Sequence, residues 1–159
     1  MHQATKIAED LDKESKYQLL LKQLEALVAG ENDLIANMAN IAAMIKNTFD
    51  FHWVGFYRMI DGELVLGPFQ GPVACTRIQI PQGVCGTCVA TKEIMVVDNV
   101  HEFEGHIACS ALSNSEIVLP FVENGEVQWI LDIDSVAFSD FDEIDRTYLD
   151  KIIRIKVTL

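Results

Sequence analysis

Four cysteines are the most reactive side chains of this sequence, and all lie between residues 75 and 109: Cys75, Cys85, Cys88 and Cys109. The segments around them are rich in Gly, Thr and Pro and predict loops or short turns, where chemistry is more frequent than in cores. The first twenty residues mix both charge signs and contain no apolar signal segment, so we expect reduced thiols rather than a disulfide framework. The cluster therefore predicts redox-active or metal-binding cysteines.

Two local patterns leave both of those chemistries open. Cys85 and Cys88 form a CxxC motif, and His106 and Cys109 form an HxxC motif further along. Tetrahedral zinc takes four nitrogen or sulfur ligands, commonly as two such pairs, so these four residues are a candidate zinc site. Redox chemistry instead needs a thiolate nucleophile, a second thiol within reach and a polar environment that lowers the pKa of the first thiol.

Three acidic residues are candidates to share one site. Asp132 and Asp134 alternate with Leu131 and Ile133, so in a strand both carboxylates emerge on the same face. Glu116 begins another apolar run and joins them if the two strands are neighbours. Crowded carboxylates raise the pKa of at least one member, which can then donate a proton near neutral pH. The alternative is a solvated face with ordinary acidic residues.

Hydrophobic periodicity predicts the helices that accompany these side chains. Apolar residues recur at spacings of three and four over 14–28 and 31–49, which predicts two amphipathic helices joined at Gly30. A short helix is expected near 84–92. The segment S-D-F-D-E is typical of a helix N-terminus and predicts a last helix over 139–155.

Six short aromatic and β-branched runs predict strands: FHWVGFYRMI, ELVLGPF, TRIQI, EIMVVD, SEIVLPFV and EVQWILDID. The dipeptides Asp61-Gly62 and Asn124-Gly125 each separate two of these runs and are strong hairpin signals. Trp53 lies in the first run, where it either packs in the core or forms the wall of a ligand pocket. Hairpin-linked strands with flanking helices indicate an antiparallel sheet of the α+β class.

Length and composition indicate one domain. The 159 residues are 50% hydrophobic with 9 Gly and 4 Pro, which is too apolar for a disordered chain. Two domains would each be too small to bury a substantial core. We therefore expect a single domain over 1–159, with the sheet core in 51–135.

The charge balance excludes two classes of partner. Against 12 Lys and Arg stand 24 Asp and Glu, a formal net charge of -12. Such a surface repels phosphate backbones and anionic membranes, so we expect no nucleic acid and no membrane partner. Because no run of about 18 apolar residues occurs, we expect a cytoplasmic protein.

Seven motifs together closely resemble the free methionine-(R)-sulfoxide reductases, which are GAF-domain proteins: WVGFY, LGPFQG, ACTRI, GVCGT, GHIAC, SNSEIV and LDIDS. The spacing of Cys75, Cys85 and Cys109 also agrees with the three cysteines of that family. The resemblance runs in motif order from Trp53 to Ser135.

The resemblance implies a six-stranded antiparallel sheet flanked by helices, and thiol-dependent reduction of free methionine R-sulfoxide with thioredoxin as reductant and no cofactor. It places Cys109 as the nucleophile, Cys75 as the principal resolving cysteine and Cys85 as the third cysteine. Cys88 departs from the family pattern, which has a small residue without a thiol there. A homodimer through the first two helices is also implied. The positions that correspond to the substrate site are Trp53, Glu116, Asp132 and Asp134.

A different class of function also uses a GAF domain. In a ligand-sensing module the pocket holds a small molecule and the cysteines are incidental. A sensor normally carries an output domain, for which 159 residues leave no room, so we expect an enzyme.

Overall fold

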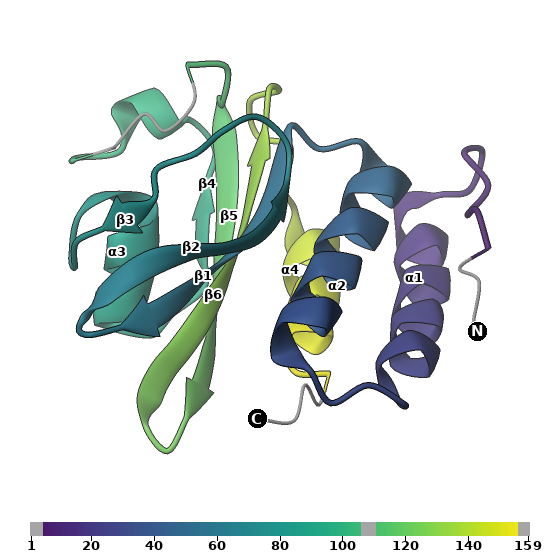
Figure 1. Ribbon diagram of the computed structural model, residues 1–159. Coiled ribbons are helices and arrows are strands. Elements are labelled where there is room, and N and C mark those ends of the chain that lie inside the picture. Colours follow the sequence, from purple (N-terminus) through teal and green to yellow (C-terminus); the bar gives the residue numbers. More distant parts are fainter. Residues whose placement is uncertain (1–4, 106–110, 156–159) are drawn as a thin grey trace.

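One antiparallel sheet of six strands forms the central layer of the protein (Figure 1). The structure is a computed structural model and describes residues 5–105 and 111–155. The spatial order of the strands is β3-β2-β1-β6-β5-β4, so the first and last long strands are neighbours at the centre. The strands are β1 (Trp53–Ile60), β2 (Glu63–Gln70), β3 (Arg77–Ile78), β4 (Met95–Val97), β5 (Ser115–Glu123) and β6 (Glu126–Ser135). The expected α+β class and antiparallel sheet are confirmed.

Helices cover the two faces of the sheet unequally. Two helices pack on one face, α2 (Leu34–Phe49) and α4 (Glu143–Ile153), and α1 (Lys13–Val28) packs on the outer side of these two helices (Figure 1). The opposite face carries α3 (Gly83–Thr91), and the short 3-10 helix η1 (Val100–Glu102) follows β4. Within the described ranges, no helix has the length and apolar character needed to cross a bilayer.

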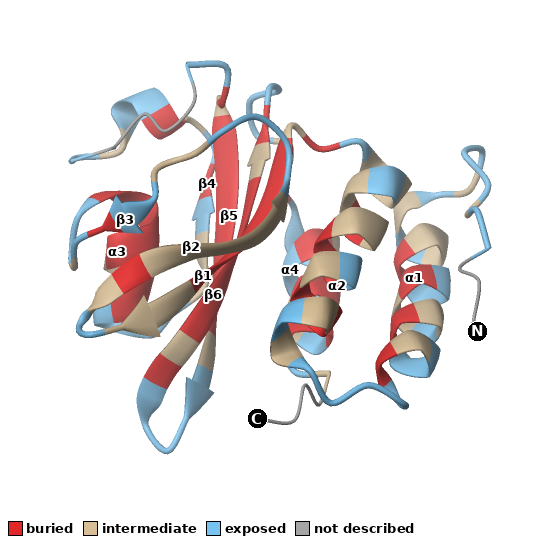
Figure 2. Ribbon diagram, viewed as in Figure 1, coloured by how far each residue is buried: buried red, intermediate tan, exposed pale blue. Residues whose placement is uncertain are grey.

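Strand alternation divides the interior into two clusters. On β6, Trp129, Leu131 and Ile133 pack in the cluster with α1, α2 and α4. Ile130 instead belongs to the cluster on the face of α3, so Asp132, two residues further, projects to that second face. The central strands are therefore buried from both sides (Figure 2).

Aspartate caps set the helix boundaries, and two of them differ from those expected. The Asp33 side chain accepts a hydrogen bond from the Ala36 amide, so α2 begins after Asp33 rather than at residue 31. Asp142 caps α4 in the same way, and the helix begins at Glu143. Ser139, where the pattern predicted the start, has a φ of 51° and is not helical.

Two hairpin turns have the geometry that their sequences predict. Asp61 and Gly62 have φ values of 51° and 84°, and Asn124 and Gly125 have 52° and 79°. Positive φ at both central residues is the signature of a two-residue type I′ turn, which matches the twist of the strands it joins.

A buried carboxylate joins α1 to α4. Asp145 is fully buried and accepts a hydrogen bond from Tyr17 Oη at 2.7 Å. Lys13 Nζ lies 2.6 Å from the other carboxylate oxygen, which also accepts the Asp142 amide at 2.8 Å. The carboxylate thus satisfies three donors from two helices distant in sequence.

We expect Asp145→Ala to lower the free energy of unfolding by about 2 to 4 kcal/mol, because the buried Tyr17 hydroxyl and the Asp142 amide lose their acceptor. Asp150→Ala is the matched control, since the Asp150–Arg154 pair on the same helix is solvent-exposed on the arginine side and is worth at most about 1 kcal/mol. Urea denaturation measures both values. Equal decreases in the free energy of unfolding of the two variants would show that the Asp145 hydrogen bonds do not stabilise the protein.

Candidate active site

The register of three central strands aligns three of the predicted residues in one row. Asp134 on β6 lies opposite Trp53 on β1 and, on its other side, opposite Glu116 on β5. Asp132 lies one step along the same face, opposite Gly55 and Val118. Residues directly opposite in an antiparallel pair share a face. The two strands therefore bring all three carboxyl groups together, as the sequence pattern predicted.

A β-bulge is required for this alignment. Near the turn, Val122 pairs with Val127, but Phe121 pairs with Trp129, so Gln128 is an additional residue in β6. The bulge shifts the register by one residue from that point on. Without it, Glu116 would lie opposite Ile133 and would project to the other face of the sheet.

Helix α3 covers the carboxyl groups and directs one cysteine toward them. Cys85 Sγ donates to Glu116 Oε1 at 3.7 Å. One ligand atom from each of Cys85, Glu116 and Asp132 lies within 4.8 Å of the other two. Each of the three residues exposes only 6% of its surface. The interpretation of these acidic residues as a solvated face is therefore wrong for Glu116 and Asp132.

Burial and mutual repulsion dominate the electrostatics of the cluster. Burial raises the pKa of Glu116 well above its usual range, and the Asp132 and Asp134 carboxyl groups raise it further. Burial likewise raises the pKa of Asp132 well above its usual range, with repulsion from Asp134 as the second cause. Burial raises the pKa of Asp134 to about 6. The buried site therefore favours the neutral form of Glu116 and Asp132 over the ionised form.

The same environment keeps the two cysteines of α3 protonated. Burial raises the pKa of Cys85 well above its usual range, and the negative charges of Asp132 and Glu116 raise it further. Burial raises the pKa of Cys88 to about 12, and its Sγ lies 3.8 Å from the carbonyl oxygen of Val118. A thiol with a raised pKa is a poor nucleophile. Neither side chain is suited to attack a substrate directly.

An aromatic wall stands beside the carboxyl row. The Trp53 ring stacks on Phe69 at a centroid distance of 5.4 Å and lies 5.9 Å from the Tyr57 ring. Gly55 permits this arrangement, because a Cβ atom there would lie 2.3 Å from the Trp53 ring and 2.5 Å from Phe69 Cβ. Glycine thus lets the indole lie across the strand next to Asp132.

The same aromatic side chains tie the Cys75 loop to the sheet. Tyr57 Oη donates to the carbonyl oxygen of Cys75 at 3.0 Å, and Trp53 Nε1 donates to that of Pro72 at 3.1 Å. The expectation of reduced thiols holds for Cys85 and Cys88, which are free, but is wrong for Cys75, which is disulfide-bonded. The loop that carries the oxidised cysteine is therefore anchored on the face that carries the carboxyl cluster.

One residue of this site and the positions of two cysteines differ from what the sequence predicts. Tyr57 was missed, although strand alternation places it on the same face as Trp53. Cys85 and Cys88 lie in α3, so the short helix expected near 84–92 is confirmed and the expectation of loops or turns around these two cysteines is wrong. Both His106 and Cys109 fall outside the described residues, so the candidate zinc set that includes them stays a prediction.

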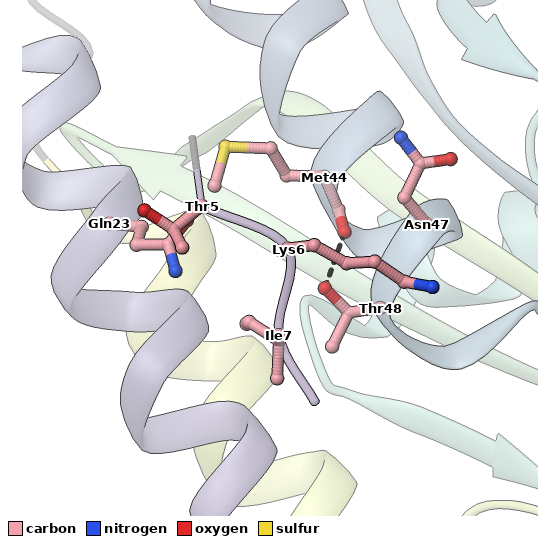
Figure 3. A pocket seen from close by; sticks show the side chains of 7 residues that line it. All are labelled: Thr5, Lys6, Ile7, Gln23, Met44, Asn47 and Thr48. Atoms are coloured by element: carbon pink, nitrogen blue, oxygen red, sulfur yellow. Dashed lines mark hydrogen bonds between the residues drawn. The ribbon is translucent and has the colours of Figure 1, made fainter. Parts of the chain in front are cut away.

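A separate hollow of about 380 Å³ lies on the helical layer (Figure 3). The side chains that line it come from the N-terminal segment, α1 and α2: Thr5, Lys6, Ile7, Gln23, Met44, Asn47 and Thr48. The lining contains no cysteine and no carboxylate, so it lacks the groups that the predicted chemistry requires.

The sequence matches the GAF domain family over residues 29–154. It is 50% identical to GAF domain-containing protein A of Dictyostelium discoideum, over 94% of this chain and 98% of that protein. It is 44% identical to the free methionine-R-sulfoxide reductase of Escherichia coli, over 90% and 87% of the two chains. The fold is similar to the crystal structure of the Neisseria meningitidis free methionine-R-sulfoxide reductase in complex with its substrate, with a TM-score of 0.93, 46% identity and coverage of 98% and 93%.

The raised carboxyl pKa values predict that Glu116→Gln stabilises the protein at alkaline pH. Because the pKa of Glu116 is higher in the folded than in the unfolded chain, the native state gains stability from protonation below the unfolded pKa and loses it as pH rises. We expect the variant to exceed the wild type by about 1 kcal/mol or more in free energy of unfolding at pH 8, with the difference shrinking toward pH 5.

Chemical denaturation at the two pH values measures this difference. Glu123→Gln is the matched control, since Glu123 lies on the same strand but is exposed. A Glu116→Gln protein whose advantage does not grow with pH would show that the cluster is not protonated in the native state.

Proposed function

The chain belongs to the GAF domain family and, within it, to the free methionine-R-sulfoxide reductases, and from this premise we propose that it reduces free methionine R-sulfoxide to methionine. The observation that carries the proposal is the buried row of Trp53, Asp134 and Glu116, with Asp132 beside it. A pocket rich in carboxyl groups fits the ammonium of a free amino acid and disfavours a peptide, which has an uncharged amide there.

The proposed reaction needs an acid and a nucleophile. The thiolate of Cys109 attacks the sulfoxide sulfur while a carboxyl group protonates the sulfoxide oxygen, because expulsion of an unprotonated oxygen would create charge in a desolvated site. With a second proton the oxygen leaves as water, and a water molecule then attacks the Cys109 sulfur, breaks its bond to the substrate sulfur and releases methionine, so that Cys109 becomes a sulfenic acid. The thiol of Cys75 then attacks that sulfur, water leaves and a disulfide forms.

Two carboxyl roles follow from the electrostatics. Asp134, with a pKa of about 6, is mostly ionised at neutral pH and suits the substrate ammonium. The pKa values of Glu116 and Asp132 lie well above their usual range, so either residue suits the proton donor. The Trp53 ring would pack on the S-methyl group, because its Nε1 is already engaged by Pro72 and only its apolar surface is available.

The state of the cysteines supports this assignment. Cys75 is disulfide-bonded, and neither Cys85 nor Cys88 is its partner, since both are free. The raised thiol pKa of Cys85 argues against a role as the thiol that attacks the substrate.

A dithiol protein of the thioredoxin class would complete the cycle by opening the disulfide through exchange, and a cytoplasmic location would supply that reductant. A homodimer through α1 and α2 is part of the proposal. Leu19 and Ile35, which expose 43% and 42% of their surfaces on these helices, support it.

We expect the purified protein to consume the R epimer of free methionine sulfoxide and to leave the S epimer. With racemic sulfoxide, thioredoxin and thioredoxin reductase, amino-acid analysis should show about half of the sulfoxide remaining, because one epimer alone places its oxygen against the carboxyl groups. Comparable turnover of the N-acetylated sulfoxide, or equal use of both epimers, would contradict the proposal. Binding without turnover would indicate a sensor module.

The thiol assignment predicts different defects for different cysteines. Cys109→Ser should abolish even a single turnover, whereas Cys75→Ser should form one methionine per enzyme and recycle poorly, because the sulfenic acid lacks its partner. Cys88→Ser is the matched control and should retain activity. Product counts in single and multiple turnover measure these defects, and a Cys88→Ser enzyme that stops after one methionine, beside a Cys75→Ser enzyme that recycles, would transfer the resolving role to Cys88.

A further inference from the structure

The geometry of the carboxyl cluster points to a second kind of ligand: we propose that Cys85, Glu116 and Asp132 bind one zinc ion and that zinc thereby competes with the substrate. The ion-binding part concerns only these three side chains. The competition rests on the proposed function, because it assumes that the substrate uses the same carboxyl groups.

Donor spacing is the first observation. In a tetrahedral site with Zn–S near 2.3 Å and Zn–O near 2.1 Å, sulfur and oxygen ligands stand about 3.6 Å apart. Cys85 Sγ and Glu116 Oε1 are 3.7 Å apart, and an Asp132 ligand atom lies within 4.8 Å of both donor atoms. The three donors thus match one ion with little movement, and a fourth position remains for water.

An unused buried oxygen is the second and independent observation. Asp132 Oδ1 is inaccessible to solvent and has no hydrogen-bond partner. Among the ion pairs of residues 5–105 and 111–155, none involves Glu116, Asp132 or Asp134. The cluster therefore has acceptor capacity and no cation from the described chain to fill it.

Ligand chemistry selects the ion. A thiolate is a soft ligand that favours zinc over magnesium or calcium, which prefer all-oxygen sites. The crowding that makes these groups retain protons is relieved by a cation, which also deprotonates a coordinating thiol. Cys88, which follows Cys85 in α3, is not part of the set, because its Sγ lies 3.8 Å from the carbonyl oxygen of Val118 on β5.

The test uses the full chain in its oxidised state, because Cys75 is then held in a disulfide and, within residues 5–105 and 111–155, the free thiols are Cys85 and Cys88. After treatment with a chelator, the protein is titrated with zinc chloride by calorimetry and with cadmium chloride by absorption, where a sulfur-to-cadmium band reports thiolate coordination. We expect one ion per chain and a cadmium band.

Variants identify the ligands. Cys85→Ser should remove the cadmium band, and Cys85→Ser and Asp132→Asn should each weaken zinc binding by at least roughly 100-fold. Cys88→Ser is the matched control and should bind as the wild type does. Circular dichroism checks folding, and Asp132→Asn supplies the test alone if Cys85→Ser does not fold.

Three results would overturn the site: no binding by the wild type, full binding by Asp132→Asn, or loss of binding in Cys88→Ser. Free methionine R-sulfoxide should raise the apparent Kd for zinc, whereas the S epimer should not, and an unchanged Kd would overturn the competition. A protein that binds zinc but lacks reductase activity would contradict the proposed function alone, whereas an active enzyme that ignores zinc would contradict this inference alone.

Discussion

Burial of like charges beneath α3 is the constraint on which the rest of the structure depends. Glu116 and Asp132 each expose 6% of their surface, and their mutual repulsion comes on top of the loss of solvation. The fold meets this cost by leaving the groups protonated. On the opposite face of the same strands, Ile117, Leu119, Leu131 and Ile133 pack in the apolar cluster with α1, α2 and α4. Burial of apolar side chains on one face of the sheet thus offsets the free-energy cost of burying carboxyl groups on the other face.

The protonation states of the carboxyl groups determine what chemistry the site can perform. A pocket of ionised carboxylates could bind an ammonium but could not deliver a proton, whereas a fully protonated pocket could do only the second. Unequal burial separates the roles: Asp134, which is half-buried between Trp53 and Glu116, has a pKa of about 6, and the pKa values of the more deeply buried Glu116 and Asp132 are raised further. The difference in burial therefore separates the group suited to bind an ammonium from those suited to donate a proton.

Much of this arrangement could be predicted from local pattern. Alternation in the LDID segment put Asp132 and Asp134 on one face, and the Asn124-Gly125 turn joined their strand to that of Glu116. Contacts between distant segments could not be predicted in this way. The hydrogen bond from Tyr57 to the Cys75 carbonyl depends on how the loop after β2 returns over β1. The placement of Cys85 above Glu116 depends on the packing of α3.

The β-bulge at Gln128 can be predicted only when the two-residue turn and the hydrophobic alternation of both strands are considered together. A two-residue turn pairs Glu123 with Glu126, and a regular ladder from there would bring Glu116 opposite Ile133. Glu116 would then enter the apolar layer of α1, α2 and α4, and Ile117 would face the carboxyl groups. Because a slip of one residue exchanges the two faces, the hydrophobic pattern permits only a register with one inserted residue. The pairing register that the turn sets differs by one residue from the register that the hydrophobic alternation requires. The bulge supplies that residue and thereby places Glu116 on the same face as Asp132 and Asp134.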